Sequence, residues 1–389
     1  MSEKRKPLKI LFVIETYFTN NNGTSISAQR FATELRKRGH EVRILTVGES
    51  GAPEIFGLEE YKLPVFGNLV EKHGFKFASH DKKVIEEAVA YADVIHCFMP
   101  FALEYHAKKE ADRQHKPATA AFHIQPENLT SSINMGKVKW INELFYKFFN
   151  RWIYKRFTHI HTPSRFMANE IIKRGYKAKV HPISNGISPD FKYRKLPKSP
   201  EFKDKILIIM VGRLACEKRQ DVIINAVPYS KYADKIQLIF AGRGPEYERY
   251  QKLGKKLKNP PIFGYYNKEE LMDVLAQCDL YVHASDMESE AISCIEAFAT
   301  GLVPVISDSK TSATSQFALD GRSLFKAGDP KDLARAIDYW LDHPSEKDYM
   351  EKIYAKSAKT YSIDNSIRMF EDMLYEAIDE YEKGTAKKS

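Results

Sequence analysis

The sequence predicts an α/β protein with two similar parallel-sheet domains that face each other. Its 389 residues are enough for two domains of roughly 150 residues or more, each with a sizeable core. A strand–helix–strand pattern opens the first half of the chain, and the same pattern returns roughly 195 residues later. Domains of this kind place their ligand sites at the carboxyl ends of the strands.

The first half opens with a buried parallel strand at residues 8–14, because this segment is short, continuous and apolar. A polar loop of small residues, 20–25, follows it. A helix is expected from there to about Arg38, where Gly39 ends it, and the next strand covers residues 41–46. Further strands are predicted at residues 93–98, 118–122, 159–162 and 180–183.

The second half repeats this order, with strands at 205–211 and 236–241 on either side of a loop and the helix 221–229. Strands are also predicted at 280–284 and 303–307. The boundary is placed in the turn-rich stretch 184–200, where Asn185-Gly186 and three prolines collect. The amphipathic last helix, about 365–382, is expected to cross back to the first domain. The predicted Rossmann-like domains are residues 1–190 with 365–389, and residues 191–364.

The composition favours a soluble, cytoplasmic protein with an anionic partner. An apolar fraction of 43% excludes a disordered chain, and no apolar run approaches the roughly 20 residues that span a bilayer. Residues 1–9 are basic but run directly into a strand, unlike a signal peptide. The net charge of +9 suits a nucleotide, a nucleic acid or an acidic membrane, with a merely solvated basic surface as the alternative. Four widely spaced cysteines favour neither a disulfide framework nor a zinc site: Cys97, Cys216, Cys278 and Cys294.

Two glutamates in the segment 285–301 are candidate ligand contacts. The segment follows a strand and turns into a helix, so that its backbone N–H groups point toward the cleft. Glu288 and Glu296 lie eight residues apart, about 12 Å along a helix. Carboxylates that flank one glycosidic bond lie roughly 5–9.5 Å apart. The pair is therefore predicted to accept hydrogen bonds from hydroxyls at two ends of a long ligand, and the alternative is that both cap or solvate the helix.

A glycine-led loop after the strand 205–211 carries two candidate phosphate ligands, Arg213 and Lys218. Arginine binds phosphate oxygens in a bidentate fashion, and lysine adds a mobile charge. The chain contains no Asp-x-Asp motif for a divalent metal, so no metal ligands are predicted and these two cations would neutralise a diphosphate themselves. Solvated surface cations are the alternative interpretation.

In this order and spacing, the motifs resemble the retaining glycosyltransferases of family 4, which have the GT-B architecture, over essentially the whole chain. The N-terminal half contributes Gly39-His40-Glu41-Val42, Asp93-Val94-Ile95-His96, Pro163-Ser164 and Asn185-Gly186-Ile187. The C-terminal half contributes Gly212-Arg213-Leu214 with Lys218, Ala241-Gly242-Arg243-Gly244-Pro245, Phe263-x-Tyr265, Ala276-Gln277-Cys278-Asp279-Leu280, the pair Glu288 and Glu296, and Gly301. Gly242-x-Gly244 lacks the third glycine of a dinucleotide-binding fingerprint, which argues against NAD.

The resemblance implies a role for each matching residue. Arg213 and Lys218 would bind the diphosphate, Glu296 the ribose, and Glu288 the hydroxyls of the donor sugar. His123 matches the active-site histidine of the family, near the donor sugar. The catalytic set is therefore His123, Arg213, Lys218 and Glu288. The other donor contacts would come from the glycines Gly23, Gly242 and Gly244, the base-proximal Phe263 and Tyr265, and the backbone amides of Ala291 and Ile292.

Two departures from the family pattern bear on specificity. Many members carry Ser-Phe-Gly where this chain reads Ser289-Glu290-Ala291, and the extra carboxylate leaves the identity of the donor sugar open. The first loop has one glycine, Gly23, where the family often has two. After His123 comes a polar loop in which Glu127 or Asn128 would contact the acceptor or position the sugar, a turn built on Pro126 being the alternative.

The stretch 137–157 combines six basic residues with eight aromatic ones and predicts an amphipathic helix suited to an anionic membrane surface. Its predicted basic face carries Lys147, Arg151 and Lys155, beside an apolar arc of Ile141, Leu144, Phe145, Phe148 and Trp152. Family members have a core-packed helix here, so packing is the alternative, and one helix can serve both purposes. A second basic aromatic segment, 72–83, favours a lipid acceptor.

The resemblance therefore implies a retaining transferase that moves a hexose from a nucleoside-diphosphate sugar, with UDP favoured over GDP. The expected acceptor is a membrane lipid such as diacylglycerol, reached from the inner face of the plasma membrane. Alternatives are a soluble or polyprenyl-linked glycan in capsule, wall or exopolysaccharide synthesis, and a sugar-nucleotide epimerase of the same fold. No cofactor is expected. Nucleic acid is not an expected partner, because the sequence has no nucleic-acid-binding module.

Overall fold

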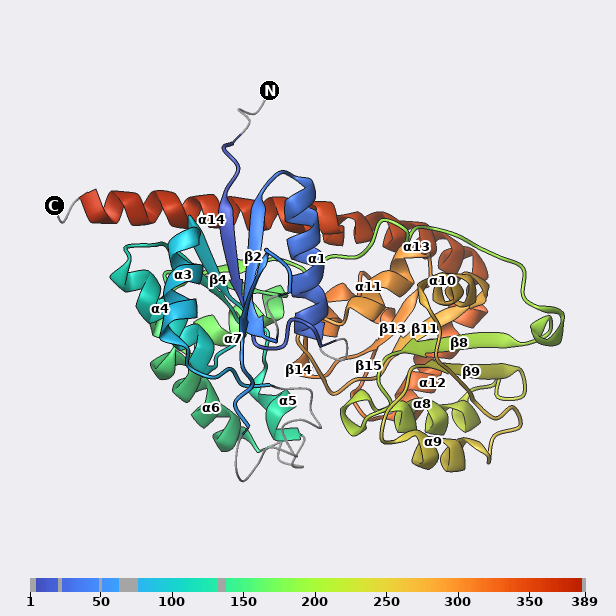
Figure 1. Cartoon of the computed structure of the whole chain (residues 1–389). Helices are drawn as coiled ribbons and strands as arrows, with labels where there is room; N and C mark the ends of the chain where they lie inside the picture. Colours follow the sequence, from blue (N-terminus) through green and yellow to red (C-terminus); the bar gives the residue numbers. More distant parts are fainter. Residues whose placement is uncertain (1–4, 20–22, 49–50, 63–75, 132–137, 387–389) are drawn as a thin grey trace. The chain divides into compact units, whose positions relative to one another are not determined.

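The computed structural model describes residues 5–19, 23–48, 51–62, 76–131 and 138–386. The chain divides into two compact units (Figure 1). Unit 1 comprises residues 1–184 and 366–389, and unit 2 comprises residues 185–365. The sequence placed this boundary after residue 190.

Unit 1 is built on a seven-stranded sheet in the order β3-β2-β1-β4-β5-β6-β7, with every pair of neighbours parallel. Its strands are β1 (Lys9–Val13), β2 (Glu41–Val47), β3 (Ile55–Leu58), β4 (Val94–Cys97), β5 (Ala118–Ala121), β6 (His159–Thr162) and β7 (Lys179–Pro182). Its helices are α1 (Gly23–Lys37), α3 (Lys82–Tyr91), α4 (Ala102–Arg113), α5 (Pro126–Ser131), α6 (Lys139–Trp152), α7 (Arg165–Lys173) and α14 (Ile363–Ala386).

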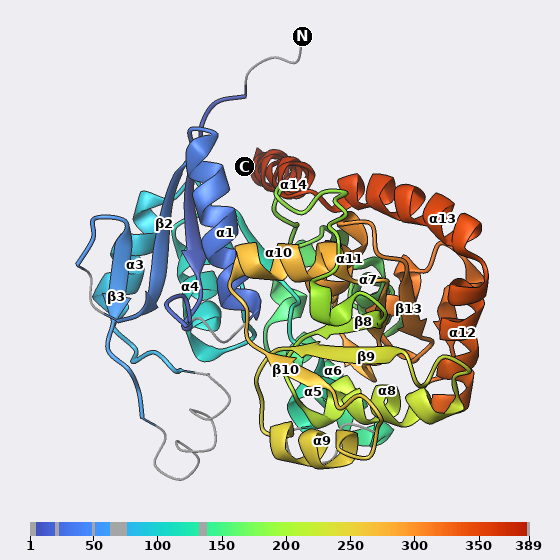
Figure 2. The ribbon, with the colours of Figure 1, turned by 90° about the vertical axis from the view of Figure 1, so that its right-hand side faces the viewer.

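Unit 2 is built on a six-stranded parallel sheet in the order β10-β9-β8-β11-β13-β15 (Figure 2). Its strands are β8 (Ile206–Val211), β9 (Ile236–Ala241), β10 (Ile262–Gly264), β11 (Leu280–His283), β13 (Pro304–Ser307) and β15 (Leu324–Phe325), with the separate pair β12 (Met287–Glu288) and β14 (Thr311–Ser312). Its helices are α8 (Gln220–Ala226), α9 (Tyr247–Gly254), α10 (Lys268–Gln277), α11 (Ile292–Ala299), α12 (Pro330–Asp342) and α13 (Pro344–Ser357).

The central strands are buried on both faces, which explains their continuous apolar sequences. All residues of β9 are buried, as are the middle four of β8. A parallel sheet that is covered by helices on both faces requires such strands. The two sheets confirm the α/β class and the two parallel-sheet domains that the sequence predicted.

The C-terminal helix returns to unit 1, as predicted. Phe370 of α14 packs edge-on against Phe31 of α1, with ring centroids 5.2 Å apart, and against His96 of β4, at 4.8 Å. At the helix surface, Glu371 accepts a hydrogen bond from Arg38 at 2.6 Å and lies 2.9 Å from a ring nitrogen of His40. Apolar packing and ion pairs therefore both attach α14 to unit 1.

Candidate functional site

The loops after β8, β9 and β10 are joined by backbone hydrogen bonds at the carboxyl edge of the unit 2 sheet. The amide of Gly242 donates to Gly264 at 2.8 Å, and the amide of Leu214 donates to Arg243 at 3.0 Å. The amide of Glu246 donates in turn to Leu214 at 3.0 Å. Three loops that are separate in sequence thus form one surface where parallel sheets place ligands.

Two of the predicted donor-site glycines have a packing role in this surface. A Cβ at Gly242 would lie 2.0 Å from the carbonyl oxygen of Gly212, and a Cβ at Gly244 would lie 2.2 Å from that of Leu214. Both contacts are with backbone, which cannot move away without shifting the loop. Glycine is therefore required at both positions so that the loops after β8 and β9 can meet.

Lys218, Glu288 and His283 form a side-chain cluster at the ends of β8 and β11. Lys218 donates a hydrogen bond to Oε1 of Glu288, and Nε2 of His283 lies 3.0 Å from the same oxygen. An ionised carboxylate only accepts hydrogen bonds, so Nε2 carries the proton and Nδ1 accepts from the hydroxyl of Tyr281 at 2.9 Å. The structure thus joins two predicted donor ligands in one ion pair and adds His283, which the sequence did not single out.

Glu288 is held in its ionised form by this cluster. Burial opposes ionisation, but the charge of Lys218 and the hydrogen bond from His283 outweigh it and hold the pKa of Glu288 well below its usual value of 4.5. Glu288 is therefore a fixed hydrogen-bond acceptor at neutral pH.

The loop that carries Lys218 is attached to the loop that carries Glu288. The amide of Asp286 donates to the carbonyl of Glu217 at 2.8 Å, and Arg219 pairs with the Asp286 carboxylate at 3.1 Å. Arg219 has a left-handed backbone, with φ 56°. Arg219 and Asp286 are thus positioning residues. The sequence did not reveal them, because the elements from α8 to β11 lie between them in the chain.

Arg213 lies at the surface of the same loop. Its side chain is 56% exposed and its guanidinium pairs with Glu217 at 2.9 Å. An exposed pair of this kind contributes about 0–1 kcal/mol, so an anionic ligand would displace Glu217 at low cost. The exposure of Arg213 is compatible with its predicted role as a phosphate ligand.

Ala291 enters α11 in a left-handed conformation, with φ 68°. This backbone favours glycine, which is the residue that the family often has here. Ala291 and Ile292 stand at the start of α11, and Glu296 is half-buried on the same helix.

Glu290 has a structural role that the sequence did not reveal. Its buried carboxylate accepts hydrogen bonds from the side-chain amide of Asn185 at 2.7 Å and from the backbone amide of Asn185 at 3.1 Å. The extra carboxylate therefore holds the first residue of unit 2 in place.

The predicted base-proximal residues differ in their surroundings. Phe263 is half-buried and packs against Phe240 and Tyr247, with ring centroids 5.4 and 5.3 Å away. Tyr265 is exposed, and the guanidinium of Arg243 lies 4.3 Å from the centroid of its ring. Tyr265 thus presents an aromatic face at the surface, whereas Phe263 fixes the end of β10.

In unit 1, the predicted catalytic His123 lies two residues after the end of β5 and is buried. Its ring stacks on Phe98 and meets His161 edge-on, with centroids 6.0 and 4.9 Å away. Burial, assisted by His161, lowers the pKa of His123 well below its usual value, so the imidazole is neutral. Its Nε2 has no hydrogen-bond partner within the described part of the chain, although a buried polar atom normally has one.

The two predicted acceptor residues are placed differently. Glu127 is buried and accepts a hydrogen bond from the hydroxyl of Tyr146 at 3.1 Å, and burial raises its pKa. Glu127 thereby joins α5 to α6. Asn128 is exposed. Gly23 is the first residue of α1, and a Cβ there would meet nothing within 4 Å.

A buried carboxyl pair, Glu15 and Glu104, was also missed by sequence reasoning. Glu15 follows β1 and Glu104 lies in the first turn of α4; both are almost completely buried. Burial raises the pKa of Glu15 to about 7, and burial together with the charge of Glu15 raises that of Glu104 well above its usual range. The position of Glu15, next to the apolar strand at residues 8–14, was the available signal.

Helix α6 has one buried face and one exposed aromatic face. Asn142, Tyr146 and Phe149 are buried. The opposite face, called the α6 stripe below, consists of the exposed Trp140, Leu144, Phe148 and Trp152. The sequence predicted a helix that continues to residue 157. In the structure, α6 ends at Trp152 and a 3-10 turn follows at Tyr154–Arg156.

The predicted apolar arc of this helix was partly wrong. Ile141 and Phe145 are half-buried, whereas Trp140 belongs to the exposed stripe. Lys147, Arg151 and Lys155 are exposed as predicted. In the second predicted membrane segment, Phe77 is half-buried against Phe101, with ring centroids 5.4 Å apart. Residues 72–75 of that segment, and residue 137 of the first, lie outside the described residues.

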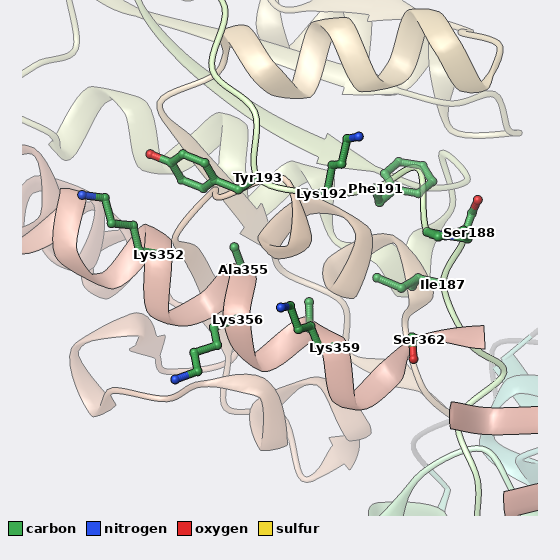
Figure 3. A pocket seen from close by; sticks show the side chains of 12 residues that line it. Ile187, Ser188, Phe191, Lys192, Tyr193, Lys352, Ala355, Lys356, Lys359 and Ser362 are labelled. Carbon is green, nitrogen blue, oxygen red and sulfur yellow. The ribbon is translucent and has the colours of Figure 1, made fainter. Parts of the chain in front are cut away.

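Unit 2 contains a pocket of about 540 Å³ (Figure 3). It is lined by residues of the segment 187–193, by helix α13 and by Ala358, Lys359 and Ser362 after that helix, and none of the predicted site residues lines it. Among the described residues, no helix is both long and apolar enough to cross a membrane.

The comparisons with known proteins agree with the fold of two parallel-sheet units. Residues 192–359 match the model of glycosyl transferases group 1, and residues 21–191 match that of glycosyltransferase family 4. The structure of Anabaena HepE in complex with UDP and glucose aligns with a TM-score of 0.70 at 15% identity, covering 95% of this chain and 100% of that chain. The catalytic domain of cholesterol-alpha-glucosyltransferase from Helicobacter pylori is 48% identical, covering 40% of this chain and 99% of that one, with a TM-score of 0.39.

Two curated relatives are also glycosyltransferases by name. The sulfoquinovosyl transferase SQD2 of Arabidopsis thaliana is 24% identical over 92% of this chain and 71% of its own length. The GPI3 subunit of phosphatidylinositol N-acetylglucosaminyltransferase from Saccharomyces cerevisiae is 32% identical over 31% of this chain. The chain spans only 28% of the length of that yeast protein.

The two parallel-sheet units and the two matching family models define a glycosyltransferase of the GT-B fold. The chain belongs to glycosyltransferase family 4, since the family 4 model and the group 1 model match consecutive parts of it, together residues 21–359. The family and the fold confirm the resemblance found in the sequence.

Proposed function

We propose that the protein transfers a hexose from a UDP-sugar to a hydroxyl group of a membrane lipid such as diacylglycerol, with retention of the anomeric configuration and without a metal ion. The enzyme would bind peripherally to the cytoplasmic face of an anionic membrane. The observation that carries the lipid acceptor is the α6 stripe, and the observation that carries the donor is the cluster of Lys218 and Glu288.

In the proposed donor complex, Arg213 and Lys218 bind the diphosphate, Glu296 binds the ribose, and Glu288 accepts hydrogen bonds from the sugar hydroxyls. The exposed pair of Arg213 with Glu217 supports this assignment, because it opens at low cost. The fixed charge of Glu288 supports its role as an acceptor of hydroxyl hydrogen bonds. The HepE complexes with UDP support UDP as the base and diphosphate of the donor.

Leaving-group stabilisation would provide most of the rate enhancement. As the bond between the sugar and the diphosphate breaks, negative charge grows on the diphosphate, and the cations Arg213 and Lys218 stabilise it. The acceptor hydroxyl attacks from the same face of the sugar, so the configuration is retained. Two cations can take the place of a divalent metal, and activity is expected to survive EDTA.

A lipid acceptor is supported by the chemistry of α6. The stripe places Trp140, Leu144, Phe148 and Trp152 at intervals of four residues on one face. The exposed Lys147, Arg151 and Lys155 suit the phosphates of an anionic membrane. Four large apolar side chains exposed on one face of a helix are unusual for a surface that contacts only water, and such a patch marks an interaction site. The yeast relative has the lipid phosphatidylinositol in its name, which adds support.

The test is a donor and acceptor screen with the full chain. UDP-glucose, UDP-galactose and GDP-mannose would each be offered with phosphatidylglycerol vesicles that contain diacylglycerol, a sterol or a polyprenyl phosphate, and with a soluble glycan. The proposal expects a UDP-sugar and a vesicle-borne hydroxyl to give a glycolipid, detected by mass spectrometry. Transfer to the soluble glycan alone would favour the capsule, wall or exopolysaccharide alternative, and transfer only from GDP-mannose would overturn the UDP assignment.

Membrane binding is tested separately from transfer. Phe148→Ser in the α6 stripe should weaken sedimentation with anionic vesicles, and added salt should weaken it further. Tyr349→Ser is the matched control, because Tyr349 is an exposed aromatic residue of unit 2 outside α6. Equal binding by both variants would remove the α6 stripe from the proposal.

A further inference from the structure

Two histidines on neighbouring strands of unit 1 lie close to a glutamate of the C-terminal helix. His159 of β6 pairs in register with Lys179 of β7, and His161 with His181. Nδ1 of His159 lies 3.0 Å from Nε2 of His181. Oε2 of Glu376 lies 3.9 Å from Nε2 of His181. The potential ligand atoms of His159, His181 and Glu376 all lie within 4.8 Å of one another.

This spacing is close to that of a tetrahedral metal site. With bonds of about 2.0–2.1 Å, the ligand atoms of a tetrahedral zinc site lie roughly 3.3 Å apart. The two imidazole nitrogens, 3.0 Å apart, are already near this separation, and Oε2 of Glu376, 3.9 Å from Nε2 of His181 and within 4.8 Å of His159, has to move closer to both. Glu376 is 37% exposed and lies on the helix surface, so its side chain has room for that adjustment.

The orientation of His159 also matches that of a metal ligand. Its ring is fully buried, and Nε2 lies 3.1 Å from a carboxylate oxygen of Glu380, one helical turn after Glu376. A carboxylate accepts, so Nε2 carries the proton and Nδ1 presents its lone pair toward His181. Metal-binding histidines commonly donate their second N–H to a carboxylate in this way.

We propose that His159, His181 and Glu376 bind one zinc ion through Nδ1, Nε2 and Oε2, with water as the fourth ligand. Two imidazoles and one carboxylate are a ligand set that zinc accepts and that magnesium does not favour. The ion would attach α14 to strands β6 and β7. Zinc would stabilise the fold of unit 1, and the site takes no part in the proposed transfer reaction.

Lys179 is a neighbour whose charge opposes zinc in this arrangement. Its ammonium pairs with Oε1 of Glu376, the oxygen that does not face His181. Lys179 is 52% exposed, so it can be replaced without opening the core. Removal of this positive charge should therefore tighten zinc binding. If the cluster were only a network of ion pairs, replacing Lys179 would remove one contact and would not increase zinc affinity. The site therefore predicts one variant with increased affinity as well as variants with reduced affinity.

The experiment is calorimetric titration of ZnCl₂ into the chelator-treated full chain. The proposal expects one saturable site in the wild type and a higher melting temperature with zinc. His181→Ala and Glu376→Gln should weaken binding by more than the roughly 10–100-fold that loss of an outer partner causes, and Glu380→Gln should fall in that range. Lys179→Gln should bind several-fold more tightly. Asp379→Asn, which removes an exposed carboxylate of the same helix, should bind as the wild type does.

Folding of the variants is checked by circular dichroism, and His181 is partly exposed, which limits the effect of its removal. Substitution with Co²⁺ gives a second readout, since four-coordinate Co²⁺ absorbs visible light and its spectrum should disappear in His181→Ala. The absence of a saturable site in the wild type would overturn the proposal. So would equal zinc affinity in Glu376→Gln and Asp379→Asn, because the ion would then bind elsewhere.

Discussion

The substitution Glu288→Gln removes the ion pair between Lys218 and Glu288 and so tests the separate role of each residue. In the free protein, Lys218 pairs with Glu288, and the side chains are only 20% and 12% exposed. A charge-assisted hydrogen bond contributes about 1.5–3 kcal/mol. A diphosphate that draws Lys218 away from Glu288 loses part of this energy. Without the carboxylate charge, free UDP should therefore bind equally well or up to about tenfold more tightly, a gain of ~1.4 kcal/mol.

Turnover should respond in the opposite direction. The side-chain amide that replaces the carboxylate would donate as well as accept, so contact with the sugar hydroxyls weakens and the rate of transfer falls. Calorimetry with UDP and steady-state kinetics with the UDP-sugar measure the two effects. Glu346→Gln is the control, because Glu346 pairs with Arg322 elsewhere in unit 2. A tenfold loss of UDP affinity in Glu288→Gln would refute the reasoning, since Glu288 would then contact the nucleotide.

The same variant predicts a pH dependence of stability. The folded-state pKa of Glu288 lies below its usual value of 4.5, so its contribution to stability is fully present above that value and is lost as the pH falls further toward the folded-state pKa. The difference in unfolding free energy between wild type and variant should be constant from about pH 6 to 8 and should shrink below about pH 4.5. A difference that is independent of pH down to about pH 3 would contradict the ion pair.

Further predictions concern the loop surface and α11. Ala291→Gly should raise the free energy of unfolding by up to about 1 kcal/mol, because glycine relieves the left-handed backbone strain of Ala291 by more than its own entropy cost. The midpoint of urea unfolding measures this change, and a clearly lower midpoint in the variant would contradict the prediction. Gly244→Ala should abolish UDP binding, because its Cβ would lie 2.2 Å from a backbone oxygen, whereas Gly321→Ala, with no neighbour within 4 Å, should bind normally. Glu296→Gln should reduce UDP affinity by roughly tenfold or more through loss of a charge-assisted hydrogen bond to the ribose, and unchanged affinity would remove that assignment.

The regular core was predictable because apolar continuity determines it. Strands β8 and β9 lie where the sequence placed them, since a segment buried on both faces must be apolar throughout. The two-residue strands β12, β14 and β15 carry too few residues for any periodicity and were not predicted.

The orientation of α6 could not be read from a helical projection, because both of its faces are rich in aromatic residues. Tyr146 is buried since its hydroxyl bonds to Glu127. Trp140 is exposed although it is as apolar in sequence. Only the tertiary partner distinguishes the two, and that partner lies on α5.

The candidate site was predicted as a set of residues but not as a set of contacts. Motif resemblance identified Lys218 and Glu288, yet it assigned them to different parts of the donor, Lys218 to the diphosphate and Glu288 to the sugar hydroxyls. Their ion pair depends on the attachment of one loop to the other through Arg219 and Asp286, residues 67 positions apart in the chain. Glu290 shows the same limit, because its partner Asn185 is 105 positions away.

We propose retaining transfer of a hexose from a UDP-sugar to a lipid hydroxyl, and the anomeric configuration of the product tests this reaction most directly. The purified 389-residue chain would be incubated with an α-linked UDP-hexose and diacylglycerol vesicles, and the organic phase would be analysed by NMR. We expect an α-glycosyl lipid, with one UDP released for each lipid formed. A β-linked lipid would contradict retention, and UDP release with only free hexose in the water phase would contradict transfer to the lipid.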